Sequence, residues 1–140
     1  AFALWDLFCV DRHSESFKEL IENNVDILFA NEDEIKAQCE TDSFDTAVEY
    51  AKSLNMIVAI TRSADGSVIV NNNEVIKINP VQVDRVVDTT GAGDLYAGGF
   101  LFGMAKAKDL ATCGNYASIA AAEIISHYGA RPLVKISNLI

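Results

Sequence analysis

The sequence predicts a layered α/β domain in which helices flank a mostly parallel sheet. Short apolar runs alternate with helical patterns along the 140 residues, an order typical of layered α/β domains. The run at residues 56–61 is almost continuously apolar, which favours a parallel strand covered on both faces. The chain has the length of one domain.

The individual elements follow from local patterns. Strands are predicted at 2–8, 25–30 and 56–61, followed by a hairpin of 67–70 and 74–78 whose turn is 71–73. Helices are predicted at 14–23, 31–40, 43–54, 91–105 and 109–128, with a turn at 63–66 and a loop at 80–87. Ser43 is the expected N-cap of the third helix, and Gly129 is expected to end the last one. Trp5, Phe100 and Phe102 are expected core residues.

Composition excludes several classes of protein. Twenty acidic and eleven basic residues give a net charge of −9, so the chain lacks the basic face of a general nucleic-acid binder. The three cysteines form no CxxC pattern, which argues against a zinc site and favours the reducing cytoplasm. The longest apolar run, 97–105, is shorter than the ~20 residues of a membrane span. Because the chain opens on an apolar run without Met or a signal peptide, we expect it to begin inside a larger fold.

The segment Asp88-Thr89-Thr90-Gly91-Ala92-Gly93-Asp94 carries the clearest chemistry. Two glycines at a helix start let backbone N–H groups point the same way, and the helix dipole adds positive charge there. This arrangement predicts an anion hole for a phosphoryl group. Asp94, beside it, is a candidate base for an attacking hydroxyl. The alternative is an aspartate that only stabilises its own helix, by about 0.3–1 kcal/mol.

Two better-known glycine motifs do not fit this segment. A Walker A loop requires a lysine after the last glycine, and none is present. The dinucleotide fingerprint would place its third glycine where Tyr96 stands, which disfavours a Rossmann-type oxidoreductase.

The segment 88–94, followed by Gly98-Gly99-Phe100, resembles the second signature of the ribokinase-like (PfkB) carbohydrate and nucleoside kinases. Three further segments resemble elements of the same family: its N-x-x-E element is matched by residues 31–34, its nucleotide-binding turn by 61–66, and its C-terminal turn by 129–132. The stretch 6–13, with 26–32, is most similar to the bacterial adenosine kinase-type branch.

The resemblance implies a ribokinase-like fold, with residues 1–140 as the C-terminal ATP-binding and catalytic portion of a single domain whose N-terminal half and lid are missing. It implies that Asp94 is the catalytic base and that Gly91, Ala92 and Gly93 form the anion hole for the γ-phosphate of ATP. In many members, positions matching Asp88 and Thr90 bind a monovalent cation such as K⁺. Backbone carbonyls near Ile124, His127 and Gly129 would complete that site.

Asn31 and Glu34 have two interpretations. From the residues alone, a capping box with Asn31 as N-cap is favoured. The resemblance instead favours oxygen ligation of Mg²⁺ at the ATP phosphates, and the two roles are compatible.

The resemblance also implies that Thr61, Ser63 and Gly66 edge the ATP site, although many members have glycine where this chain has Ser63. Ser118 aligns with a position near the adenine. The alternative for Ser118 is a small residue in a helix–helix contact.

The expected activity is ATP-dependent phosphorylation of a primary hydroxyl of a sugar or nucleoside. Adenosine or a related nucleoside is the first expectation, then ribose, fructose or 2-keto-3-deoxygluconate. The alternative is a non-catalytic nucleotide-binding module that keeps the fold. The family's substrate site lies mostly in the N-terminal half, so these residues alone are expected to be inactive or nearly so. A homodimer through the lid is a further expectation, and no nucleic-acid or membrane partner is expected.

Overall fold

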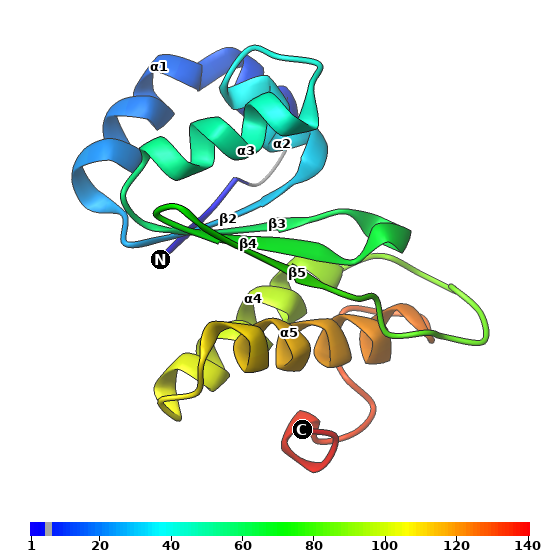
Figure 1. Cartoon of the computed structure of the whole chain (residues 1–140). Helices are drawn as coiled ribbons and strands as arrows, with labels where there is room; N and C mark the ends of the chain where they lie inside the picture. The colour runs from blue at the N-terminus through cyan, green and yellow to red at the C-terminus, as the bar shows by residue number, and fades with distance from the viewer. Residues whose placement is uncertain (5–6) are drawn as a thin grey trace. The chain divides into compact units, whose positions relative to one another are not determined.

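The structure is a computed structural model that describes residues 1–4 and 7–140, except for the side chains of Leu7, Cys9 and Asp11. The described strands are β1 (Phe2–Ala3), β2 (Ile27–Asn31), β3 (Ile57–Thr61), β4 (Ser67–Asn71) and β5 (Glu74–Ile78). The helices are α1 (Leu7–Asn24), α2 (Glu32–Gln38), α3 (Phe44–Ser53), α4 (Ala92–Ala105) and α5 (Leu110–Ile125), with short 3₁₀ helices η1 (Ser63–Asp65) and η2 (Ile136–Asn138) (Figure 1). The expectation that Trp5 is a core residue lies outside the described residues. No described helix has both the length and the apolar character that crossing a membrane requires.

The described residues form two compact units. One comprises Ala1–Arg62 and Val68–Ile76, and the other comprises Ser63–Ser67 and Lys77–Ile140. The strands form one sheet in the order β1-β2-β3-β4-β5. β1, β2 and β3 are parallel, and β4 and β5 form the predicted hairpin, so the sheet is mixed. The predicted α/β fold class is confirmed.

The core of the first unit lies between its strands and α1, α2 and α3, which cover one face of β2 and β3 (Figure 1). Alternate residues of the parallel strands point into this core, among them Leu28 and Ala30 of β2 and Val58 and Ile60 of β3. The neighbouring residues Phe29 and Ala59 are buried as well. Burial of both faces explains why the sequence of these strands is almost continuously apolar.

The first predicted strand is too long. Strand pairing of β1 ends near Leu4, whose N–H donates to the carbonyl of Phe29 at 2.9 Å, and residues 7 and 8 belong to α1. Short apolar runs do not distinguish a strand from a buried helix. α1 has a kink at His13, with φ −127° and ψ 21°, so its second part begins at Ser14, where the sequence predicted a helix start.

The second unit is built on the antiparallel pair of α4 and α5. The two helices approach closely because α4 presents Gly99 and Gly103 to the backbone or side chains of Tyr116, Ala117 and Cys113. Phe100 is fully buried, as predicted. Phe102 is 37% exposed and lies against the Tyr116 ring at 6.3 Å between centroids. The core prediction for Phe102 is therefore wrong. Most residues of α4 are apolar, so its sequence does not indicate which face of the helix is buried.

α5 ends at Ile125, three residues before the predicted end. The Ser126 hydroxyl donates to the carbonyl of Glu123 at 2.6 Å, and the Ser126 N–H bonds to the same carbonyl at 3.2 Å. A side chain that takes a helical carbonyl in this way competes with continuation of the helix. The residues from 126 to 134 are thus free to form a turn.

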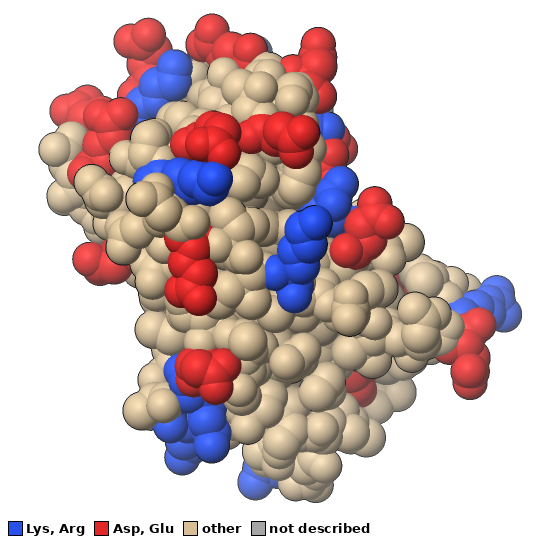
Figure 2. Space-filling view, in the orientation of Figure 1, with Lys and Arg blue, Asp and Glu red and all other residues tan. Residues whose placement is uncertain are grey.

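Acidic side chains gather over the helices of the first unit on the face shown in Figure 2, where basic side chains are scattered. An anionic ligand on this face would rely on backbone N–H groups and helix starts rather than on a broad basic surface.

Candidate functional site

The glycine-rich segment forms a tight turn into α4. Gly91 adopts φ 82°, in the left-handed region that favours glycine. A Cβ at this position would lie only 3.0 Å from the Cβ of Ala130. The N–H of Val87 donates to the carbonyl of Ile125 at 2.8 Å, which ties the preceding residues to the end of α5. Glycine is therefore required at position 91 by both conformation and packing.

Asp88 joins this turn to the one that follows α5. Its Oδ1 accepts the N–H of Thr90 at 2.9 Å, and its Oδ2 accepts the N–H of Gly129 at 3.2 Å. Hydrogen bonds from the Thr90 side chain and N–H, and then from Gly129, lower the pKa of the Asp88 carboxyl. Asp88 is therefore ionised at neutral pH, with Thr90 and Gly129 beside it, and these are three of the positions predicted around a monovalent cation.

The start of α4 leaves several backbone donors unused. Ala92 donates to the carbonyl of Thr89 at 3.1 Å, and Leu95 donates to that of Gly91 at 2.9 Å. Within the described part of the chain, the N–H groups of Gly91, Gly93 and Asp94 have no backbone partner. A Cβ built on Gly93 would meet no atom within 4 Å. Of the three residues predicted to form the anion hole, Gly91 and Gly93 thus have available amides, whereas that of Ala92 is engaged.

Asp94 lies in the first turn of α4 and is exposed. Its carboxylate has no hydrogen bond or ion pair with any described residue. An exposed carboxylate beside unpaired amides at a helix start is chemically able to accept a proton from a bound hydroxyl. The same position also fits the alternative given above, in which the charge of Asp94 only stabilises the start of its own helix.

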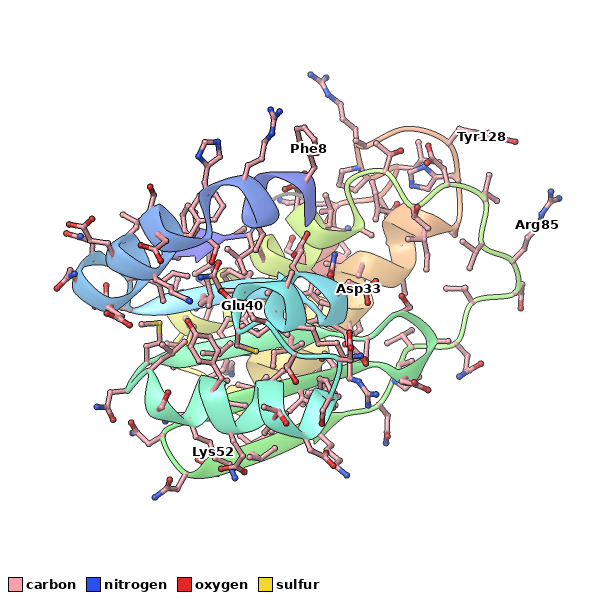
Figure 3. The ribbon with its side chains drawn as sticks, turned by 90° about the horizontal axis from the view of Figure 1, so that it is seen from above. Phe8, Asp33, Glu40, Lys52, Arg85 and Tyr128 are labelled. Carbon is pink, nitrogen blue, oxygen red and sulfur yellow. The ribbon has the colours of Figure 1, made fainter. Side chains whose placement is uncertain are left out.

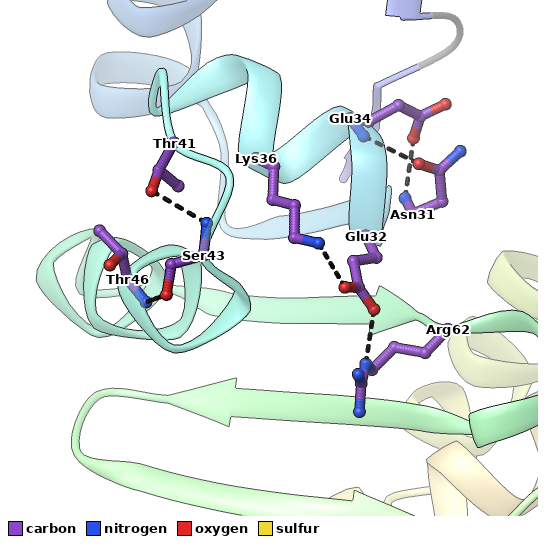
Figure 4. Close-up of polar contacts among 8 residues, drawn as sticks. All are labelled: Asn31, Glu32, Glu34, Lys36, Thr41, Ser43, Thr46 and Arg62. Atoms are coloured by element: carbon purple, nitrogen blue, oxygen red, sulfur yellow. Dashed lines mark hydrogen bonds and ion pairs between the residues drawn. The ribbon is translucent and has the colours of Figure 1, made fainter.

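Asn31 and Thr61 lie opposite each other at the carboxyl ends of the parallel strands β2 and β3. This end of a parallel α/β sheet is where ligands generally bind. Asn31 begins α2 with a complete capping box: its Oδ1 accepts the N–H of Glu34, and Glu34 Oε2 accepts the N–H of Asn31, both at 2.8 Å (Figure 4). The capping box predicted from the residues alone is therefore confirmed.

An ion-pair cluster beside this capping box was not predicted. Glu32 accepts from Lys36 Nζ at 2.5 Å and from Arg62 Nε at 2.8 Å (Figure 4). These hydrogen bonds lower the pKa of the Glu32 carboxyl, and the bond from Lys36 has the larger effect. The Arg62 guanidinium also stacks 3.9 Å from the centroid of the Phe44 ring. Arg62 directly follows Thr61, so the cluster fixes the carboxyl end of β3 to the start of α2.

The predicted nucleotide-binding turn contains two residues with positive φ. Ser63 has φ 49° and Gly66 has φ 79°, and the Gly66 N–H donates to the carbonyl of Ser63 at 3.3 Å. A Cβ on Gly66 would lie 2.2 Å from the carbonyl oxygen of Ile78, so only glycine fits there. Ser63 occupies a left-handed conformation that glycine adopts more easily. Ser118, the remaining predicted residue, is 8% exposed in α5.

Comparison with known proteins agrees with these features. The profile of the pfkB family carbohydrate kinases matches residues 6–136. A curated "uncharacterized sugar kinase" of Archaeoglobus fulgidus is 38% identical over 81% of this chain and 45% of its own length.

Among solved structures, the adenosine kinase of Sinorhizobium meliloti has a TM-score of 0.95 and 42% identity, over 98% of this chain and 42% of that one. The ribokinase of Thermotoga maritima has a TM-score of 0.72 and 29% identity, over 80% of this chain and 39% of that one. The chain thus spans less than half the length of the relatives it matches. The predicted ribokinase-like fold is confirmed, and the chain belongs to the pfkB family of carbohydrate kinases.

Proposed function

We propose that the protein transfers the γ-phosphoryl group of ATP to a hydroxyl group of a sugar or nucleoside. On this proposal the 140 residues are the C-terminal ATP-binding and catalytic portion of a single ribokinase-like domain. The observation that carries it is the start of α4, where exposed Asp94 stands beside the unpaired N–H groups of Gly91 and Gly93. The family membership supports the same reaction class.

In the proposed reaction the hydroxyl oxygen attacks the γ-phosphorus in line, the bond from this phosphorus to the oxygen that bridges to the β-phosphate breaks, and ADP leaves. Asp94 accepts the proton of the hydroxyl. The segment Gly91–Ala92–Gly93 forms the hole for the transferred phosphate. The N–H groups of Gly91, Gly93 and Asp94 stabilise the charge that develops on the phosphoryl oxygens. Phosphoryl transfer depends more on positioning and charge stabilisation than on a strong base, which suits an aspartate.

Two cation sites fit the residues present. Asn31 and Glu34 offer the oxygen donors that Mg²⁺ prefers, and Mg²⁺ commonly keeps several waters. Since Asn31 Oδ1 and Glu34 Oε2 each already accept an N–H, contact through water suits them best. Bound Mg²⁺ would neutralise phosphate charge. Asp88 and Thr90 would hold a monovalent cation such as K⁺, and the lowered pKa of Asp88 favours its charged form.

ATP itself would extend along Thr61, Ser63 and Gly66, with Ser118 near the adenine. Thr61 supports this placement because it ends β3 opposite Asn31. Among acceptors we place adenosine first, since the related adenosine kinase of S. meliloti is 42% identical over nearly all of this chain. Ribose, fructose and 2-keto-3-deoxygluconate follow.

The test is Asp94→Asn in the natural full-length protein, with Asp109→Asn as matched control. Asp109 also begins a helix, and its Oδ1 caps the Thr112 N–H at 2.8 Å, a role that asparagine performs equally well. We expect Asp94→Asn to lower kcat by about 10²–10⁴-fold with ATP affinity, measured by calorimetry, little changed. Near-normal turnover in Asp94→Asn would refute the role. ATP binding by the wild type without transfer to any alcohol would instead support a nucleotide-binding module.

A further inference from the structure

Glu123 is an acidic residue in the alanine-rich helix α5 to which no role has been assigned. Its side chain is 9% exposed. Its Oε1 accepts the N–H groups of Leu133 at 2.8 Å and Val134 at 3.3 Å, and lies 3.2 Å from Nε2 of His127. Its Oε2 is buried and has no hydrogen-bond partner among the described residues. One carboxylate oxygen therefore accepts two backbone N–H groups of the turn that follows the helix and lies beside the His127 ring.

Such a carboxylate is costly to bury, and hydrogen bonds are what offset the cost. The bonds to Leu133 and Val134 span ten and eleven residues, so they close residues 126–134 into a turn against the end of α5. The Tyr128 side chain adds little to this packing, because it is 81% exposed and points outward (Figure 3).

The same turn contacts the start of α4 at two points. The N–H of Gly129 donates to Asp88 Oδ2 at 3.2 Å. Ala130 packs on Gly91 so closely that a Cβ on Gly91 would lie 3.0 Å from the Ala130 Cβ. Both contacts involve residues beside the unpaired amides at the helix start. All of these residues belong to the second compact unit.

We propose that Glu123 is a positioning residue: it fixes the turn 126–134, and through Gly129 and Ala130 that turn fixes the start of α4, where the phosphate-binding amides lie. The part of this inference that concerns phosphoryl transfer rests on the proposed function. The structural part does not, because it concerns only the coupling between Glu123 and the helix start. Glu123 touches no reacting atom and acts through the backbone that it holds.

The test compares Glu123→Ala with Glu123→Gln in the natural full-length protein. Alanine removes all three contacts. Glutamine keeps a carbonyl oxygen that can accept the same donors, and its amide group replaces the Oε2 that has no partner. Glu49→Ala is the matched control, because Glu49 is an exposed carboxylate paired with Lys52 in the first unit. Two quantities are measured: amide hydrogen exchange by NMR, and kcat and KM for ATP.

We expect Glu123→Ala to speed exchange of the Leu133 and Gly129 amides by about tenfold or more. The Leu95 amide, which makes the first hydrogen bond of α4 to Gly91, should exchange faster as well. The kcat should fall by about tenfold with a smaller change in KM, because misplaced amides stabilise the transition state less. Glutamine should restore exchange and kcat to within about threefold of wild type, and Glu49→Ala should change neither.

Two outcomes would overturn the inference. Unchanged exchange of Leu133 and Gly129 in Glu123→Ala would mean that the carboxylate does not hold the turn. Faster exchange there, with Leu95 and kcat unaffected, would mean that the turn is not coupled to the helix start. If Glu123→Ala does not fold, Glu123→Asp replaces it, since its carboxylate is one methylene shorter. A wild type without transferase activity would refute the proposed function, and the exchange of Leu95 would still decide the coupling.

Discussion

Gly98 and Gly99 are neighbours in α4 that should respond in opposite ways to the same substitution. A Cβ on Gly99 would lie 2.7 Å from the carbonyl oxygen of Tyr116 and 2.9 Å from the Cα of Ala117. Both are backbone atoms of α5, so no side chain can turn aside. A Cβ on Gly98 would meet no atom within 4 Å. The pair therefore separates the helix propensity of alanine from its effect on packing.

The magnitudes follow from these distances. Replacing glycine by alanine inside a helix gains about 0.8–1 kcal/mol at either position. Ordinary Cβ contacts begin at 3.4 Å, so Gly99→Ala would have to push α5 away by about 0.7 Å, and overpacking of this kind typically costs about 1–3 kcal/mol. The push would also loosen the contacts of the buried Phe100. We expect Gly98→Ala to stabilise the protein by about 0.8–1 kcal/mol. At Gly99 the packing cost outweighs the same gain, and we expect Gly99→Ala to destabilise the protein by up to about 2 kcal/mol.

The assay is urea unfolding of the natural full-length protein followed by circular dichroism, with the free energy of unfolding extrapolated to water. A difference of about 1–3 kcal/mol between the two variants is expected, with Gly98→Ala the more stable, because the propensity gain is common to both. Equal free energies, or a Gly99→Ala variant more stable than wild type, would refute the close approach of α4 and α5.

Two further predictions concern buried or charged hydrogen bonds. The Tyr96 hydroxyl donates to Ser67 Oγ at 2.7 Å, and the two residues are 4% and 1% exposed. Tyr96→Phe should lower the free energy of unfolding in urea by about 1–3 kcal/mol, because it leaves the buried Ser67 hydroxyl unpaired. Adding Ser67→Ala should recover part of that loss. An additive double mutant would contradict this pairing. The carboxyl of Glu32 has a pKa below the ordinary 4.5 because it accepts hydrogen bonds from Lys36 and Arg62. Its ionised form therefore stabilises the fold above pH 4.5, and this stabilisation is lost as the pH falls through the lowered pKa. Glu32→Gln should therefore lower the Tm at pH 7 and approach the wild-type Tm in acid; a Tm difference that does not vary with pH would contradict this.

Features encoded by a few adjacent residues were predictable from the sequence. The Ser43 side chain accepts the Thr46 N–H as an N-cap should, and the capping box of Asn31 and Glu34 follows from their spacing. The hairpin is equally local: Asn72 takes φ 53° in its turn, a conformation that asparagine tolerates and that two-residue hairpin turns need. In each case the residues that decide the structure are within four positions of one another.

Element ends were less predictable, because tertiary contacts decide them. The apolar run at 2–8 was predicted to be a strand, but residues 7 and 8 belong to α1, whose Val10 lies in the core. The last helix was expected to continue until Gly129, but it ends at Ile125, where the Ser126 hydroxyl takes the carbonyl of Glu123 and the Glu123 carboxylate accepts the Leu133 N–H. A propensity argument does not include the partner at Leu133.

The candidate site shows the same division. The composition of segment 88–94 predicts an anion hole, but the contacts that hold this segment come from elsewhere in the chain. Gly129 binds Asp88 across 41 positions, and Glu123 binds Leu133 across ten. Nothing in a signature seven residues long specifies these partners. The signature alone is therefore not sufficient for the proposed chemistry. On the inference above, a relative that kept 88–94 but lost the carboxylate at position 123 would present the same glycines on a loosened turn. We expect such a relative to bind and transfer phosphate less effectively than its signature implies.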